Sequence, residues 1–230
     1  MEKVYTIFAG VNGAGKTTLY KTNQNATVGQ KRVNSDEILR ENKGDWRNNG
    51  DQVKAMKEAV KRVKQYLDKG ISFNQETTLA GNSIINNIKK AKENGFKVKM
   101  FYVGLQSADL AVQRVNDRVR KGGHGIEEKD IRRRYEASLK NLKTAINVCD
   151  EVNVYDNTVE FRHIASFKDG KKVNGKEKCE WLEQALSKNE ELQKEGPNMD
   201  REGWRSSVND APSFNMAEQN NICSERSERK

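Results

Sequence analysis

Apolar residues along the chain follow two periods, one typical of β-strands and one typical of helices. Five short runs rich in β-branched and aromatic residues predict strands that begin near Val4, Lys31, Ile71, Lys97 and Val152. Segments between these runs carry apolar residues three and four positions apart and often stop at glycine. Strands that alternate with amphipathic helices predict an α/β fold with a parallel five-stranded sheet flanked by helices.

Residues 51–70 show the clearest helical pattern. Their apolar stripe predicts a helix that ends at Gly70 and packs on the sheet through Val53, Met56, Val60, Val63 and Leu67. Residues 82–95 also end in glycine and predict a second helix of this kind.

Composition limits the classes of protein to consider. Hydrophobic residues make up 34% of the 230 positions and charged residues 33%, which predicts a lean core under a charged surface. Without an apolar run of eighteen residues or a signal-type start, we expect a cytoplasmic protein that does not enter a membrane. The three cysteines are far apart and lack metal-ligand spacing, so we expect them to be reduced.

We expect one domain over residues 1–194 and a flexible or disordered tail over 195–230, where both prolines lie and apolar residues become sparse. The chain has a net charge of +9, and the positive charge belongs to the folded part, because the tail has more Asp and Glu than Lys and Arg. A basic surface suits nucleic acid, but it equally suits an enzyme that handles several phosphates, and we consider nucleic acid the less favoured partner.

After the first strand, GVNGAGKTT (10–18) fits the phosphate-binding pattern G-x-x-x-x-G-K-[ST]. Backbone N–H groups of such a loop converge on phosphate oxygens, Lys16 reaches the β and γ phosphates, and the Thr17 hydroxyl can hold Mg²⁺. The helix that follows adds its positive end. We therefore expect a P-loop NTPase fold that binds ATP through Gly10, Asn12, Gly13, Ala14, Gly15, Lys16, Thr17 and Thr18.

Polar side chains follow the second and third strands, where a parallel sheet binds its ligands. Asn34 and Asp36 follow the second strand, and Asp36 could accept the proton of an attacking hydroxyl or hold magnesium. Glu76 and Thr78 follow the third and suit a grip on a sugar or nucleoside hydroxyl. A helix cap formed by Ser35 or Asp36, or by Glu76, is the alternative.

Residues 118–136 join two helices through a glycine pair and many arginines. Arg118 lies on the polar face of the first helix, and the run IRRRY (131–135) opens the second. Such a loop can close over a bound triphosphate and bring guanidinium groups to the transferring phosphoryl, although a solvated basic face would have the same composition. His124 at the loop apex is a candidate for contacting the substrate or locking the lid.

The last predicted strand ends at Asp156, Asn157 and Thr158. An amide side chain there can donate to and accept from adenine, so Asn157 is a candidate for base recognition. An ordinary turn through Asp156 and Asn157 is the alternative.

In this order, IFAGVNGAGKTTL (7–19), VNSDEIL (33–39), ETTLAG (76–81), RVNDRVRKGGHGI (114–126), IRRRY (131–135) and VYDNT (154–158) resemble the zeta toxin family, with the best match over residues 4–173. The helical pattern of residues 176–194 is an addition to that match, expected to pack through Trp181, Leu182 and Leu186. The resemblance implies an ATP- and Mg²⁺-dependent kinase that phosphorylates a sugar nucleotide such as UDP-N-acetylglucosamine, with a possible antitoxin partner.

By motif position, the resemblance implies a catalytic set of Lys16, Asp36 as general base, Arg118 and either Arg133 or Arg134. Thr17 would be the magnesium ligand, Glu76 and Thr78 would contact the sugar, and Asn157 would lie near adenine. A kinase with another acceptor, such as a nucleotide or a nucleic-acid end, is the alternative within enzymes. A nucleotide-binding protein without transferase activity is the alternative outside them.

Overall fold

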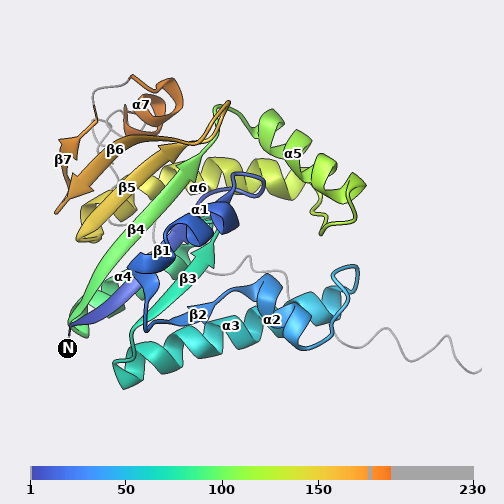
Figure 1. The fold of residues 1–230 in the computed structure, drawn as a ribbon, viewed down its shortest axis with the longest axis horizontal. Coiled ribbons are helices and arrows are strands. Elements are labelled where there is room, and N and C mark those ends of the chain that lie inside the picture. Colours follow the sequence, from blue (N-terminus) through green and yellow to red (C-terminus); the bar gives the residue numbers. More distant parts are fainter. Residues whose placement is uncertain (1, 176–177, 188–230) are drawn as a thin grey trace, which may run out of the picture. The chain divides into compact units, whose positions relative to one another are not determined.

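The computed structural model describes residues 2–175 and 178–187, and Figure 1 shows the arrangement of their helices and strands. The tail predicted over 195–230 lies outside this range. Within the described part, one sheet has the order β2-β3-β1-β4-β5-β6-β7. Its strands are β1 (Lys3–Ala9), β2 (Lys31–Val33), β3 (Phe73–Thr77), β4 (Phe96–Gly104), β5 (Glu151–Asp156), β6 (Arg162–Lys168) and β7 (Lys171–Asn174).

The prediction of an α/β fold with a parallel sheet is confirmed, but the prediction of five strands is wrong because the sheet has seven. The five predicted strands, β1 to β5, all run parallel. The two additional strands, β6 and β7, are antiparallel to their neighbours and extend the sheet beyond β5. Asp169 and Gly170, both with positive φ, form the tight turn between them.

Helices cover both faces of the sheet. They are α1 (Lys16–Thr22), α2 (Ser35–Glu41), α3 (Asn49–Lys69), α4 (Asn82–Glu93), α5 (Ala108–Arg120), α6 (Glu128–Val148) and α7 (Glu180–Ser187), with a short 3-10 turn at Gln24–Thr27. No helix in the described ranges has the length and apolar character needed to span a bilayer.

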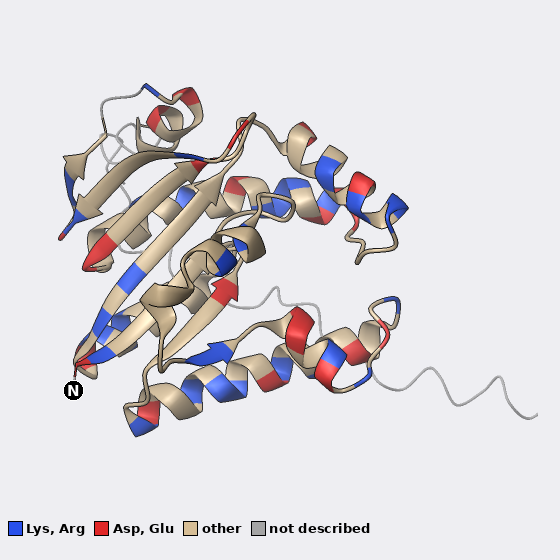
Figure 2. Cartoon of the chain, viewed as in Figure 1, with Lys and Arg blue, Asp and Glu red and all other residues tan. Residues whose placement is uncertain are grey.

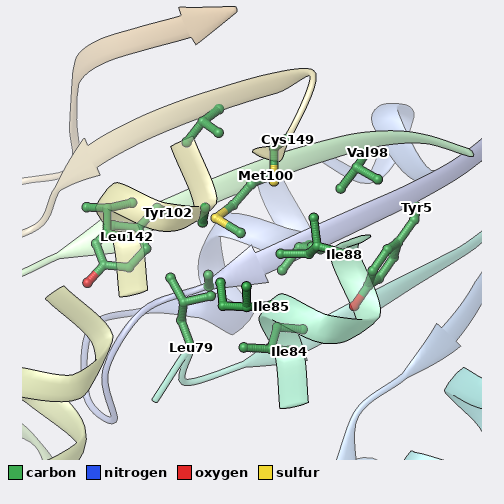
Figure 3. Close-up of a cluster of buried hydrophobic side chains, with 14 of the residues drawn as sticks. Tyr5, Leu79, Ile84, Ile85, Ile88, Val98, Met100, Tyr102, Leu142 and Cys149 are labelled. Atoms are coloured by element: carbon green, nitrogen blue, oxygen red, sulfur yellow. The ribbon is translucent and has the colours of Figure 1, made fainter. Parts of the chain in front are cut away.

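Alternation along β1 divides the core between the two faces of the sheet. Tyr5 and Ile7 face a cluster that includes side chains of α3, α4, α6 and α7. Phe8 faces the opposite cluster, built with α1, α5 and the start of α6. Figure 3 shows part of the first cluster, where Ile85 and Ile88 of α4 lie towards Met100 of β4.

The register of the central strands fixes the position of the candidate site. Ala9 at the end of β1 pairs with Thr77 at the end of β3, and Val33 at the end of β2 pairs with Gln75. The carboxyl ends of β1, β2 and β3 therefore lie at one edge of the sheet. Residues 10–18, 34–37 and 76–78 meet there.

The apolar stripe predicted for the helix at 51–70 is buried only in part. Val63 and Leu67 are buried in α3, but Val53, Met56 and Val60 are 48%, 57% and 67% exposed. Ala55 and Ala59 take the inward positions instead. The helix α3 approaches α2 and β2 through these alanines. The larger apolar side chains in the N-terminal half of α3 therefore lie to the side of the face that packs on the rest of the protein.

The helix predicted after residue 176 is present as α7, whereas the part of that prediction beyond Ser187 lies outside the described residues. Trp181 and Leu182 are buried and Leu186 is partly buried against the same cluster. The ring of Trp181 occupies the space that a side chain on Gly104 would need, because a Cβ there would lie 2.3 Å from the ring. The end of β4 is therefore covered by the C-terminal helix.

Candidate active site

The phosphate loop bends through backbone conformations that favour glycine. Gly10 has φ 141°, and a Cβ at this position would lie 2.2 Å from the carbonyl oxygen of Val103. Gly15 has φ 100° and precedes the first residue of α1. These glycines let the chain leave β1 and turn directly into α1, which directs backbone N–H groups towards the space above the loop.

Lys16 lies at the start of α1 with its ammonium group over the phosphate loop. Its Nζ donates to the carbonyl oxygen of Val11 at 3.2 Å. Burial lowers the pKa of Lys16 from its ordinary value, although the nearby carboxylates of Glu76 and Asp36 act in the opposite direction. A cation desolvated in this way gains most from an anionic ligand such as a phosphate.

Asn34, rather than Ser35 or Asp36, caps the helix that follows β2. Its Oδ1 accepts hydrogen bonds from the backbone N–H groups of Asp36 at 2.8 Å and Glu37 at 3.3 Å. The alternative in which Asp36 serves as the cap is therefore wrong. Asp36 instead has a 58% exposed carboxylate that lines the cavity described below.

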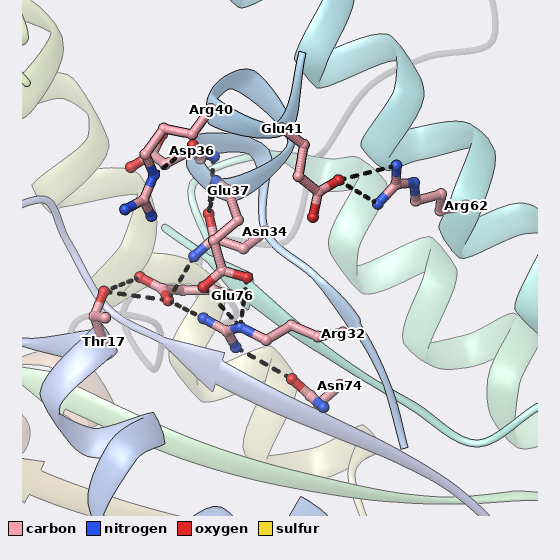
Figure 4. Close-up of polar contacts among 10 residues, drawn as sticks. All are labelled: Thr17, Arg32, Asn34, Asp36, Glu37, Arg40, Glu41, Arg62, Asn74 and Glu76. Carbon is pink, nitrogen blue, oxygen red and sulfur yellow. Dashed lines mark hydrogen bonds and ion pairs between the residues drawn. The ribbon is translucent and has the colours of Figure 1, made fainter. Parts of the chain in front are cut away.

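Glu76 is joined to the phosphate loop by a hydrogen bond from Thr17 (Figure 4). The Thr17 hydroxyl donates to Oε1 at 3.0 Å, and Asn34 Nδ2 donates to Oε2 at 2.9 Å. Arg32 Nη2 also donates to Oε2 at 2.9 Å. Glu76 does not cap the next helix, α4, because its N-cap is Gly81, which makes no side-chain cap bond.

Three arginines of the predicted lid line the cavity, and one of them also contacts the phosphate loop. Arg118 at the end of α5 packs against Gly123, and among the described residues its buried Nε has no hydrogen-bond partner. Arg134 Nη1 donates to Asn12 of the phosphate loop at 3.3 Å. Arg133 is 66% exposed and pairs with Asp130 at 2.9 Å, so of the two arginines left open by the sequence it is Arg134 that contacts the loop.

His124 is not an isolated loop apex, because it stacks on Trp46. The two rings lie 5.2 Å apart and within 20° of parallel. Burial lowers the pKa of His124, and its Nδ1 lies 4.0 Å from Asp36 Oδ1. In Figure 1 the α5–α6 connection accordingly faces the α2–α3 connection, and the lid touches the other side of the site through this stack.

Asn157 lies against the phosphate loop. Its Nδ2 donates to the carbonyl oxygen of Ala14 at 2.9 Å and lies 2.8 Å from the position of a Cβ on Gly15. The neighbouring Asp156 accepts from the Thr158 hydroxyl at 2.6 Å, which forms the turn considered as the alternative. The turn thus presents Asn157 to the outer side of the loop.

One cavity of about 1070 Å³ collects most of the predicted site residues. Gly10, Ala14 and Asn157 do not line it and support the loop from behind or beside it. Those that line it are Asn12, Gly13, Gly15, Lys16, Thr17, Thr18, Asn34, Asp36, Glu76, Thr78, Arg118, His124, Arg133 and Arg134.

The sequence pointed to neither Arg32 nor Trp46. A charged residue next to the buried Val33, with Glu37 five positions later, is a signal that could have identified Arg32. A single tryptophan in the polar stretch NKGDWRNNG (42–50) is a comparable signal for Trp46. Both derive their role from partners distant in the chain.

The charge distribution does not form one continuous basic surface. Figure 2 shows Lys and Arg alternating with Asp and Glu along α3 and α5, and pairs such as Arg62–Glu58 and Arg120–Asp117 bring opposite charges together. The positive groups that line the cavity are Lys16 of the phosphate loop, Arg118, Arg133 and Arg134 of the lid, and Arg47 and Arg114.

The donor set at Thr17 and Glu76 fits Mg²⁺. A hydroxyl and a carboxylate are hard oxygen ligands, and Mg²⁺ in phosphate sites takes one or two protein oxygens beside the phosphates. Within the described residues, no group of three or more His, Cys, Asp or Glu side chains could hold a metal by themselves. A metal here would therefore depend on the bound nucleotide for further ligands.

Comparison with known proteins identifies the family. The model of the Zeta toxin family matches residues 1–166. An uncharacterized protein of Haemophilus influenzae is 36% identical over 135 residues, which is 59% of this chain and 94% of that protein.

Two solved structures share the fold. One is the complex of AvrRxo1-ORF1 and AvrRxo1-ORF2 with ATP, with a TM-score of 0.62 and 17% identity over 81% of this chain. The chain spans 64% of the length of that protein. The other comes from the PezAT chromosomal toxin-antitoxin system of Streptococcus pneumoniae, with a TM-score of 0.54 and 15% identity, covering 84% of this chain and 83% of that one.

Proposed function

This chain belongs to the Zeta toxin family, and we propose that it is an ATP-dependent phosphotransferase whose acceptor is a hydroxyl of a sugar nucleotide such as UDP-N-acetylglucosamine. The observation that carries the proposal is the position of Asp36. Its carboxylate is free of the helix cap and lines the same cavity as Lys16. A base and a phosphate grip in one cavity suit transfer to a hydroxyl.

In the proposed reaction, the oxygen of the acceptor hydroxyl bonds to the γ phosphorus while Asp36 takes the proton of that hydroxyl. The bond between that phosphorus and the β–γ bridging oxygen breaks, and ADP leaves with the electron pair. Lys16 contacts the β and γ phosphates, and Arg118 and Arg134 stabilise charge on the transferring group. The position of both arginines in the lining of the cavity that holds Lys16 supports this role.

Mg²⁺ would be held by the Thr17 hydroxyl, with Glu76 beside it. When bound, the metal would neutralise phosphate charge. Asn34, Thr78 and His124 line the same cavity and would contact the acceptor. Asn157 would lie towards the adenine. Its hydrogen bond to the carbonyl oxygen of Ala14 would also help to order the phosphate loop.

The test uses purified protein with Mg²⁺, ATP and UDP-N-acetylglucosamine, and detects products by mass spectrometry. Wild type should form a singly phosphorylated sugar nucleotide, and Asp36→Asn should lower the rate by about 10²–10⁴-fold while ATP affinity stays within a factor of about two. Glu41→Gln is the matched control, because Glu41 lies on the same helix and its carboxylate is also 58% exposed.

Three other outcomes would change the proposal. Labelling of nucleotides or oligonucleotide ends in place of the sugar nucleotide would move the acceptor to that class. ATP binding with no transfer to any of these acceptors would favour a nucleotide-binding protein. An Asp36→Asn variant as active as wild type would remove Asp36 from the mechanism.

The proposal includes a toxin role in the cytoplasm, with an antitoxin protein as partner. The family and the toxin-antitoxin system of the S. pneumoniae structure support it. Harm to a bacterial host that expresses the chain alone, relieved by a co-expressed neighbouring gene, would support this part. Free expression of active enzyme without any partner would argue against it.

A further inference from the structure

Arg32 lies directly behind the candidate active site without lining its cavity. It is the middle residue of β2, and its side chain is 14% exposed. Buried arginines are uncommon unless their charge is paired and their donors are used. The partners of Arg32 therefore indicate what the residue is for.

The guanidinium of Arg32 contacts side chains of three other elements, and Figure 4 shows its contacts with α2 and β3. Nε donates to both carboxylate oxygens of Glu37 on α2 at 2.9 Å, and Nη1 donates to Asn74 Oδ1 on β3 at 3.2 Å. Nη2 donates to Glu76 at 2.9 Å, and the guanidinium plane stacks on the Tyr20 ring of α1 at 3.5 Å. The planar fork of arginine can make all these contacts together, whereas a lysine ammonium cannot.

These contacts treat the two oxygens of Glu76 differently. Oε2 accepts from Arg32 and from Asn34, each at 2.9 Å. Oε1 accepts from the Thr17 hydroxyl at 3.0 Å and, within the described ranges, from no other donor, while the same hydroxyl makes a longer contact of 3.3 Å with Oε2. Arg32 thus anchors one oxygen and leaves the other turned towards Thr17 and the cavity.

We propose that Arg32 is a positioning residue for phosphotransfer, which acts by holding the Glu76 carboxylate against the phosphate-loop hydroxyl of Thr17. The inference rests on the proposed function for the reaction that it serves. Because Glu76 also faces Lys16, a carboxylate held in one orientation fixes both the charge beside the lysine and the oxygen beside the metal position. Residues that orient such ligands commonly change metal affinity or activity by about 10–100-fold.

Arg62 provides a comparison within the same part of the fold. It pairs with Glu41 at 3.3 Å and Glu58 at 3.1 Å and is 28% exposed, so it also joins two carboxylates. Figure 4 shows the contact between Arg62 and Glu41 away from Thr17 and Glu76. Loss of Arg62 removes an ion pair between α2 and α3 without touching the site.

The experiment compares wild type, Arg32→Gln, Arg32→Lys and Arg62→Gln. Affinity for a fluorescent ATP analogue is measured with and without Mg²⁺, and kcat and KM are measured with UDP-N-acetylglucosamine. In Arg32→Gln we expect the Mg²⁺-dependent gain in ATP affinity and kcat each to fall by about 10–100-fold. Affinity without Mg²⁺ should stay within about twofold, and Arg32→Lys should recover part of the loss because it keeps the charge.

Arg62→Gln should match wild type in all of these values. A folded Arg32→Gln protein with the wild-type response to Mg²⁺ and the wild-type kcat would overturn the inference, even if its melting temperature had fallen. Should Arg32→Gln fail to fold, Arg32→Lys decides by the same two readouts. Wild type that binds ATP with Mg²⁺ but does not phosphorylate the sugar nucleotide contradicts the proposed acceptor, while the Mg²⁺ comparison still decides the role of Arg32.

Discussion

Lys16 shows how a side chain can serve binding at a cost to stability. Burial lowers its pKa, which means that the charged form is disfavoured in the folded protein without a nucleotide. An uncharged side chain of similar length avoids that penalty. Function and folding therefore make opposite demands on this position.

We predict that Lys16→Met loses most of its ATP affinity but unfolds at a higher temperature than wild type at neutral pH. A gain of about 1 kcal/mol would correspond to about 2–4 °C for a domain of this size. Calorimetry without nucleotide and a binding titration with ATP measure the two effects. A lower melting temperature in the variant would show that the ammonium group stabilises the fold.

The same pKa shift determines how the stability of the protein changes with pH. Because the folded pKa lies below the ordinary 10.5, the unfolded chain binds more protons in the interval between the two values. The destabilisation that comes from burying the charged Lys16 is complete at neutral pH. It decreases as the pH rises through the pKa that Lys16 has in the folded protein. The difference in melting temperature between Lys16→Met and wild type should accordingly become smaller in alkaline solution.

At the same scale, local motifs could be predicted from the sequence and long-range partners could not. Lys16 and Thr17 belong to a contiguous pattern whose chemistry is carried by spacing alone. Asp36 could be named as a candidate, but its release from the helix cap depends on Asn34 taking that place. Arg32 acquires its role from Glu76, which is 44 positions away.

At the scale of the element, the loop between β1 and α1 depends on backbone geometry more than on side-chain contacts. Gly10 combines positive φ with a close approach to Val103, whereas Gly29 has φ 77° and open space around its Cβ position. A substitution at Gly29 therefore tests the cost of positive φ alone, whereas one at Gly10 tests that cost together with a steric overlap.

We predict that Gly10→Ala destabilises the protein by more than about 3 kcal/mol and abolishes ATP binding, because the new methyl group overlaps a backbone carbonyl in addition to the strain. Gly29→Ala should cost about 1–2 kcal/mol and leave ATP affinity unchanged. Urea unfolding gives the two free energies. Equal losses in both variants would mean that the loop shifts to accommodate the methyl group.

Helical periodicity located α3 but did not determine which apolar residues it buries. The pattern favoured Val53, Met56 and Val60, yet Ala55 and Ala59 are buried. Close approach of α3 to α2 requires small side chains at the contact, and a hydrophobicity pattern ranks them below valine and methionine. Met56 and Val60 remain exposed and line the cavity together with the two alanines.

At the scale of the whole molecule, the C-terminal helix is tied to the sheet through a buried carboxylate. Trp181 Nε1 donates to Asp156 Oδ1 at 3.0 Å, and Arg162 pairs with Oδ2 at 3.1 Å. Burial alone would raise the pKa of Asp156, but hydrogen bonds from Thr158, Trp181 and Arg162 lower it below its ordinary value. Asp156 also precedes the turn that presents Asn157.

We predict that Trp181→Phe lowers the free energy of unfolding by about 1.5–3 kcal/mol at neutral pH, because a charged acceptor loses a donor. The folded pKa of Asp156 lies below 3.8 in wild type, so its stabilising contribution is present above that value and is lost as the pH falls through the folded pKa. The difference between wild type and variant should therefore narrow below about pH 4. A pH-independent difference would assign the loss to packing of the ring.

The sequence predicted the parallel part of the sheet but not its extension. Alternating strands and helices identify β1 to β5, because each crossover needs a helix. The β6–β7 hairpin was missed, although Asp169 and Gly170 are a turn signal between two short runs. The strand pattern of the second run is weak, because β7 is exposed throughout and has no alternation of buried and exposed positions.

The central position of β1 has a consequence for how the protein is made. Among the strands of this sheet, β1 is synthesised before the others, yet its two neighbours come much later, because Tyr5 pairs with Phe73 and Lys3 pairs with Phe96. The edge of β1 that pairs with β4 therefore stays open until β4 has emerged from the exit tunnel, although β3 can cover the other edge earlier. Completion of the sheet that carries the nucleotide site is thereby postponed until β4 has been translated, and pairing between segments so far apart in the chain slows folding.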